Sequence, residues 1–110
     1  MAYDRGLADR IRELLEPEDG ITEKAMFGGL AFLVNGNMAV AANGDGGAMA
    51  RVADHTGVEL AARHPALAPM VMRGREMKGW LHAELDDLDD DLLAELVEQG
   101  VAHARTLPPK

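Results

Sequence analysis

The residue pair Asn35-Gly36 constrains the fold of this chain more than any other feature of its sequence. Apolar segments lie on both sides of it, GLAFLV at 29–34 and MAVAA at 38–42. Asn-Gly is the strongest short signal for a β-hairpin, because both residues of a tight two-residue turn need a positive φ angle. The first segment is apolar on both faces, as a central strand is. The sequence therefore predicts a hairpin inside an antiparallel sheet.

Further strands are predicted before and after this hairpin. The segment ITEKAMFG at 21–28 alternates loosely between apolar and polar residues, and the glycine-rich turn NGDGG at 43–47 leads into AMARVA at 48–53. A second hairpin is predicted from PMVM at 69–72 and MKGWLHAEL at 77–85, joined by the basic turn RGRE.

Three segments have helical periodicity. Residues 3–16 form the first predicted helix, with Asp4 as its N-cap, and Pro17 follows it. Residues 54–63 form a short helix before Pro65, and residues 89–106 form the last. The apolar side chains expected to face the core are Leu7, Ile11, Leu14, Leu15, Val58, Leu60, Ala61, Leu92, Leu93, Leu96, Val97 and Val101.

The order of these elements predicts an α+β fold. Antiparallel strands with flanking helices give a two-layer sandwich, α-β(3-4)-α-β(2)-α, and 110 residues indicate a single domain over 1–110. Aromatic residues are only 4% of the chain. We therefore expect Leu, Val, Ala and the seven Met to fill the core, together with Phe27, because Met is an adaptable filler.

Composition excludes several classes of chemistry. The chain has no Cys and no Ser, so disulfides, thiolate metal sites, Cys nucleophiles and serine hydrolase chemistry are impossible. The four His lack the spacing of a metal site, and the acidic run at 84–92 is interpreted as a capped helix start rather than a cation loop. We expect no catalytic residues, no metal and no cofactor, and hence no enzyme activity.

Charge and hydropathy indicate which kinds of binding partner are disfavoured. The formal net charge is −8, which repels phosphate at long range and disfavours nucleic-acid binding unless the charges segregate. The N-terminus lacks the apolar core of a signal peptide, and no apolar run approaches the ~20 residues that span a bilayer. These features predict a cytoplasmic protein without membrane contact, either a monomer or a homodimer.

Gly28-Gly29 follows an aromatic residue inside a predicted strand. A glycine pair there permits a bulge, a sharp bend or the close approach of another backbone or ligand. It is not a phosphate loop, since no Gly-Lys-Thr sequence and no helix start follow it. We interpret the pair as a bulge that shapes the sheet.

The second hairpin carries the most suggestive candidate surface. Cations beside an indole can recognise an anion or stack on a base. The alternative is a solvated turn with the Trp anchored in the core. The candidate interaction or ligand surface consists of Lys24, Arg51, Arg73, Arg75, Lys78 and Trp80.

These motifs resemble a known family. TEKAMFGGLAFLVNGNMA, then ARVA, then PMVMRGREMKGWLHAEL and a helix ending ARTLPPK are similar to the N-terminal domain of the TfoX/Sxy competence regulators. The resemblance implies a secretion-chaperone-like α/β sandwich and a role in transcriptional regulation of competence. It also implies a protein partner in the transcription machinery, such as a cyclic-AMP receptor-type regulator. The residues taken as the structural motif are Met26, Phe27, Gly28, Gly29, Asn35, Gly36 and Gly79.

Three hypotheses follow for function. The first is a non-enzymatic regulatory or protein-interaction module, which requires an exposed apolar patch on the sheet or an open strand edge. The second is direct nucleic-acid binding through the six candidate residues, which must then share one face. The third is a small-molecule-binding domain or a cryptic enzyme, with a pocket between the Gly28-Gly29 bulge and the strand of Trp80.

Overall fold

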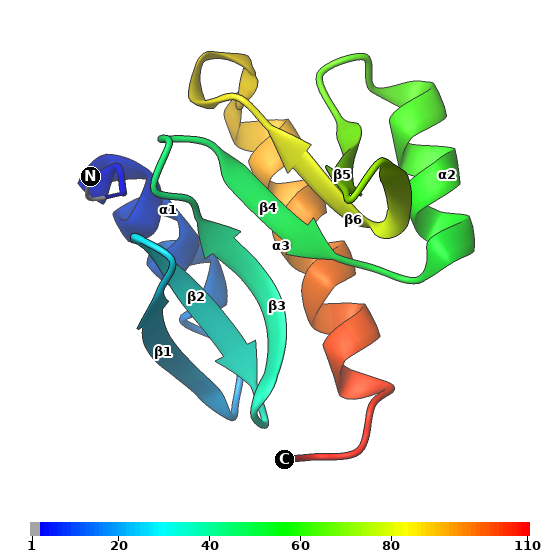
Figure 1. Cartoon of the computed structure of the whole chain (residues 1–110). Coiled ribbons are helices and arrows are strands. Elements are labelled where there is room, and N and C mark those ends of the chain that lie inside the picture. The colour runs from blue at the N-terminus through cyan, green and yellow to red at the C-terminus, as the bar shows by residue number, and fades with distance from the viewer. Residues whose placement is uncertain (1–2) are drawn as a thin grey trace.

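The computed structural model describes residues 3–110 and confirms the α+β fold (Figure 1). Its elements are α1 (Arg5–Leu15), β1 (Ile21–Met26), β2 (Gly29–Val34), β3 (Asn37–Ala42), β4 (Ala48–Arg51), α2 (Asp54–Arg63), β5 (Ala68–Met72), β6 (Arg75–Ala83), a 3₁₀ turn η1 (Leu85–Asp87) and α3 (Asp90–Arg105). Within these residues, six strands form one antiparallel sheet in the order β1-β2-β3-β4-β6-β5. Four strands therefore precede α2 and two follow it.

Three of the strand connections are two-residue turns with positive φ at both positions. The predicted Asn35-Gly36 turn is one of them, with φ angles of 51° and 85°. The other two are Phe27-Gly28, at 50° and 75°, and Arg73-Gly74, at 54° and 77°. The turn of the second hairpin is thus shorter than the predicted RGRE, because β6 already begins at Arg75.

The bulge predicted at Gly28-Gly29 is wrong, although the pair does shape the sheet. Gly28 occupies the turn, and a Cβ atom at Gly29 would lie 2.5 Å from the carbonyl oxygen of Ala42. Gly29 is therefore needed where the end of β3 approaches closely. The β1–β2 pair keeps a continuous register, and the nearest register shift lies in the β2–β3 pair, between Phe32 and Leu33.

The helices cover one face of the sheet. In Figure 1, α1 and α3 lie behind β2, β3 and β4, and α2 lies beside β5 and β6. Leu7 of α1, Leu60 of α2 and Leu96 of α3 belong to a single buried cluster with inward side chains of the strands. Burial of this apolar surface is the main term that stabilises the fold.

The predicted helix caps and inward residues are mostly confirmed. The Asp4 carboxylate accepts a hydrogen bond from the Leu7 backbone N–H at 2.8 Å, and the Asp89 carboxylate accepts one from Leu92 at 2.7 Å. Two predicted core residues are wrong, since Leu14 is 36% exposed and Val58 is 53% exposed. Helical periodicity defines a wider arc than the face that is buried, so it also included these two positions.

Methionine does not fill the core, contrary to the expectation from composition. The buried cluster consists of Leu, Val, Ala, Ile11 and Phe32. Of the methionines in residues 3–110, none is buried. Phe27, also expected in the core, is 99% exposed at its turn. Small Ala side chains bring the helices close to the sheet, so fewer large side chains fill this core.

Gly79 and Gly57 bring the backbone of β6 close to its neighbours. A Cβ atom at Gly79 would lie 2.6 Å from the Val52 carbonyl oxygen, and one at Gly57 would overlap the Lys78 carbonyl oxygen. The Gly79 carbonyl oxygen also accepts a hydrogen bond from the Val52 N–H at 2.7 Å. These contacts set the position of the strand that carries Trp80.

None of the helices within residues 3–110 is both long and apolar enough to cross a bilayer.

Candidate functional site: a methionine-rich groove

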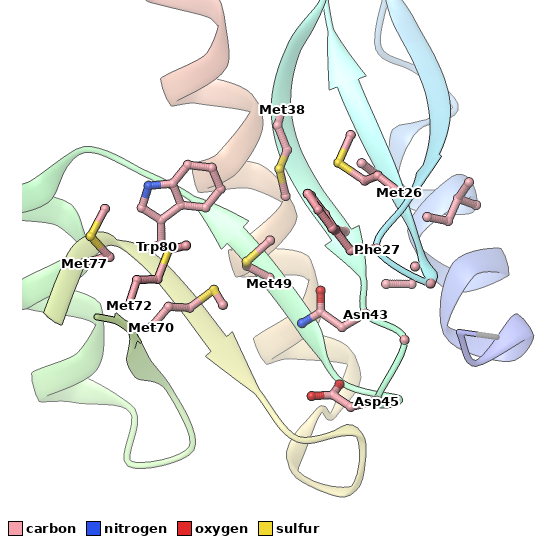
Figure 2. A pocket seen from close by; sticks show the side chains of 17 residues that line it. Met26, Phe27, Met38, Asn43, Asp45, Met49, Met70, Met72, Met77 and Trp80 are labelled. Atoms are coloured by element: carbon pink, nitrogen blue, oxygen red, sulfur yellow. The ribbon is translucent and has the colours of Figure 1, made fainter. Parts of the chain in front are cut away.

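The face of the sheet opposite the helices contains an open apolar groove of about 700 Å³. Figure 2 shows methionine side chains from several strands directed into it, with Trp80 at one side and Phe27 at the other. The methionines that line the groove are Met26, Met38, Met49, Met70, Met72 and Met77. They are all the methionines of the described chain.

Strand alternation explains the floor of the groove. Ala31 is opposite Ala41, which is opposite Met49, and all three line the groove. Their neighbours Phe32, Val40 and Ala50 are buried against the helices because successive side chains of a strand point to opposite faces. The two alanines are small, which leaves a hollow between the longer side chains.

Two irregularities of the sheet add further side chains to the groove. The register shift in the β2–β3 pair turns Met38 to the same face as Ala41, three positions along the strand. A second shift in the β5–β6 pair places both Met77 and Trp80 in the groove. Bulges commonly re-aim a side chain in this way.

Phe27 lies at the lip of the groove in an unfavourable conformation. Its φ angle of 50° is rare for a bulky residue and is adopted more readily by Asn or Gly. The side chain is 99% exposed, so no burial within the domain offsets this cost. Strained residues cluster at functional sites, and Phe27 lines the groove.

Arg51 and Trp80 are in direct contact at the other side of the groove. They are cross-strand partners, and the Arg51 guanidinium carbon lies 5.0 Å from the centre of the Trp80 ring, a cation–π geometry. Burial, and then the charge of Arg51, lower the pKa of His103 on α3, while Asp54 raises it.

Three of the predicted basic residues share the face of the groove. Directly opposite residues in an antiparallel pair point to the same face. Lys24 is opposite Ala31, Arg75 is opposite Met72 and Arg51 is opposite Trp80, and each of these partners lines the groove. We call Lys24, Arg51 and Arg75 the basic rim.

The other two predicted cations, Arg73 and Lys78, do not belong to the basic rim. Arg73 occupies the tip of the second hairpin, and Lys78 is exposed where its own carbonyl group faces Gly57. Unlike the basic rim, neither is paired across strands with a residue that lines the groove. The structure therefore gathers Trp80 and the basic rim, and leaves Arg73 and Lys78 outside that set.

Carboxylates are sparse on this face despite the net charge of −8. Asp45 lines the groove at the β3–β4 turn. Glu23 alternates to the helix side, where Arg12 donates hydrogen bonds to it at 2.6 Å and 2.9 Å. These hydrogen bonds lower the pKa of Glu23. The groove face is thus locally basic in an acidic protein.

The groove suits binding of apolar groups. Among its side chains, Asn43 and Asp45 are the ones with hydrogen-bonding oxygen or amide groups. In the part of the chain described, no group of three or more His, Cys, Asp or Glu side chains could hold a metal ion. The groove also extends from Gly28 and Gly29 to Trp80, where the third hypothesis placed a pocket.

Sequence reasoning missed the methionines, although a signal was present. Each of the six lies in a predicted strand and none in a predicted helix. Helices here carry Leu and Val inward, so methionine confined to strands indicates the sheet face that the helices leave open. Phe27 had no such signal, because phenylalanine is unusual in a tight turn.

The fold and groove define a class of protein: a small α+β domain with helices on one sheet face and an open apolar groove on the other. The family model of the TfoX N-terminal domain matches residues 13–104, a range that includes all the residues of the groove. The chain belongs to the TfoX N-terminal domain family. No curated protein and no solved structure matches it.

Proposed function

We propose that this protein is a non-enzymatic regulatory domain that binds a partner protein in its methionine groove. Membership of the TfoX N-terminal domain family supports a TfoX-like role. The proposal includes transcriptional co-regulation in the cytoplasm, with a partner from the transcription machinery such as a cyclic-AMP receptor-type regulator.

The observation that carries the proposal is the apolar character of the uncovered sheet face. An antiparallel sheet with one solvated face normally alternates apolar-in and polar-out. Here the outer face presents six Met, Trp80 and Phe27 instead. Contiguous exposed apolar surface marks interaction sites, and methionine side chains adapt to the shape of a partner.

A small apolar molecule is the second candidate ligand. The volume of about 700 Å³ falls within the range of small-molecule sites, and the lining is mainly apolar with few polar groups. The groove nevertheless opens along a sheet face instead of enclosing a ligand. Nucleic acid has less support, because the floor is apolar and the carboxylate of Asp45 lines the groove at the β3–β4 turn.

Substituting Met49→Lys tests the proposal. Met49 lies on the open face, so the charge is expected to leave the fold intact and to reduce capture of a protein partner by about ten-fold or more. The measurement is affinity capture from a nuclease-treated lysate of the host, quantified by mass spectrometry. Val58→Lys is the matched control, because Val58 is 53% exposed on α2.

Equal capture by wild-type, Met49→Lys and Val58→Lys proteins would contradict the proposal. Loss of a bound small molecule from Met49→Lys, detected by native mass spectrometry without any lost protein, would favour the second candidate.

A further inference from the structure

We infer that the occupant of the methionine groove is an amphipathic α-helix with acidic flanks, supplied by another protein. This inference rests on the proposed function and specifies the partner's chemistry. It follows from the length of the groove, the lack of hydrogen-bonding groups on its floor and the charges at its edges.

The span of the groove fits a short helix. Its lining residues extend from Met26 on β1 to Met70 on β5, at opposite edges of the sheet. Six strands spaced by about 4.8 Å span roughly 24 Å. A helix rises 1.5 Å per residue, so about 16 residues cross this distance.

A helix also fits the apolar floor better than an extended segment does, because its backbone groups need no partners from the groove. An extended peptide lying across the face would leave its own N–H and C=O groups without partners on an apolar floor, which is costly. Among the lining side chains, only Asn43, Asp45 and the indole N–H of Trp80 offer strong hydrogen-bonding partners. A helix pairs its backbone groups internally and presents an apolar stripe to the methionines.

The charges around the groove select an acidic helix. Lys24, Arg51 and Arg75 share its face, against one lining carboxylate, Asp45. Side chains that flank the apolar stripe of a bound helix would meet this basic rim. Acidic side chains on these flanks would be attracted to the basic rim, and basic side chains would be repelled by it.

A second copy of this chain is a poor occupant. The apolar residues of α3, such as Leu93 and Leu96, and those of α1, such as Leu7 and Ile11, are already buried in the core. Within residues 3–110, α1 and α3 therefore leave no apolar stripe for the groove of another copy, and the exposed large apolar side chain of α2 is a single one, Val58. The helix therefore comes from a different protein.

Trp80 provides the test, since it is the only Trp of the chain and lines the groove. The probes are two 16-residue peptides stapled as helices, one with a Leu stripe flanked by Glu and one with the same stripe flanked by Lys. A third peptide has the Leu–Glu composition in an order that abolishes the stripe. Binding is measured from Trp80 emission at several salt concentrations.

We expect the Leu–Glu helix to shift Trp80 emission saturably and to bind about ten-fold or more tightly than the Leu–Lys helix. The double substitution Lys24→Glu/Arg75→Glu should remove or reverse this preference and flatten the salt dependence. Arg5→Glu, a charge reversal at an exposed position of α1, should leave both unchanged. Circular dichroism confirms that each variant is folded.

Equal binding of both striped helices, tighter binding of the Leu–Lys helix or the scrambled peptide, or binding of none would overturn the inference. The proposed function and this inference can be told apart: if Met49→Lys loses the cellular partner while the peptides do not bind, the proposed function stands and the acidic helix is the wrong class of partner.

Discussion

Replacing Gly57 with alanine is expected to destabilise the protein by about 3 kcal/mol. The added methyl group would overlap the Lys78 carbonyl oxygen of β6, which is backbone and cannot move aside as a flexible side chain can. The higher helix propensity of alanine, worth about 1 kcal/mol, offsets only part of this cost. Separation of α2 from β6 would also displace Trp80 and Met77, and so distort the groove.

Urea denaturation followed by circular dichroism measures this effect. Gly6→Ala is the matched control, because Gly6 is also in a helix and its Cβ atom would meet only the Asp4 side chain, at 3.3 Å. We expect Gly6→Ala to change the free energy of unfolding by no more than about 1 kcal/mol. A Gly57→Ala protein as stable as the wild type would show that α2 does not pack this closely.

Replacing Phe27 with asparagine is expected to stabilise the fold and weaken partner binding. Asparagine tolerates the φ angle of 50° better than phenylalanine and favours this type of turn. Relief of the left-handed conformation is worth about 1 kcal/mol, and the 99% exposed ring loses no packing. The lost ring is, however, part of the groove lip, so capture of the partner should fall.

Arg73→Asn separates the two effects. Arg73 occupies the equivalent position of the β5–β6 turn, with a φ angle of 54°, and does not line the groove. We expect it to raise the free energy of unfolding by a similar amount while leaving partner capture unchanged. Thermal unfolding and affinity capture are measured on both variants. A Phe27→Asn protein that is less stable than the wild type would mean that the ring packs within the domain.

Local rules predicted the frame of this fold well. The Asn35-Gly36 turn, the Asp4 cap and the capped helix start in the acidic run at 84–92 each depend on a few adjacent residues. The structure confirms all three, with Asp89 as the cap of the last helix. The turn at Phe27-Gly28 was not predicted, because its first residue contradicts the usual turn preferences. Tertiary context, here the approach of Ala42 to Gly29, overrides local preference at that site.

The candidate site depends on strand register and strand order, which rules based on adjacent residues do not predict. Met38 and Met77 enter the groove through register shifts, which become visible only once strands are paired. Basic residues far apart in the sequence, Lys24 and Arg75, share a face because of the order of strands. The apolar chemistry of methionine led us to predict it in the core. In the structure, Leu, Val, Ala, Ile11 and Phe32 fill the space between the helices and the sheet.

Photo-cross-linking through methionine tests most directly whether the groove binds a partner protein. The purified protein is labelled with photo-methionine, Met1 is removed by cleavage, and the protein is irradiated in nuclease-treated host lysate. Every remaining diazirine then lies in the groove. Labelling with photo-leucine is the control, since its sites lie mainly in the core. We predict a discrete protein adduct from photo-methionine and little from photo-leucine; a captured partner that cross-links only through photo-leucine would contradict the account.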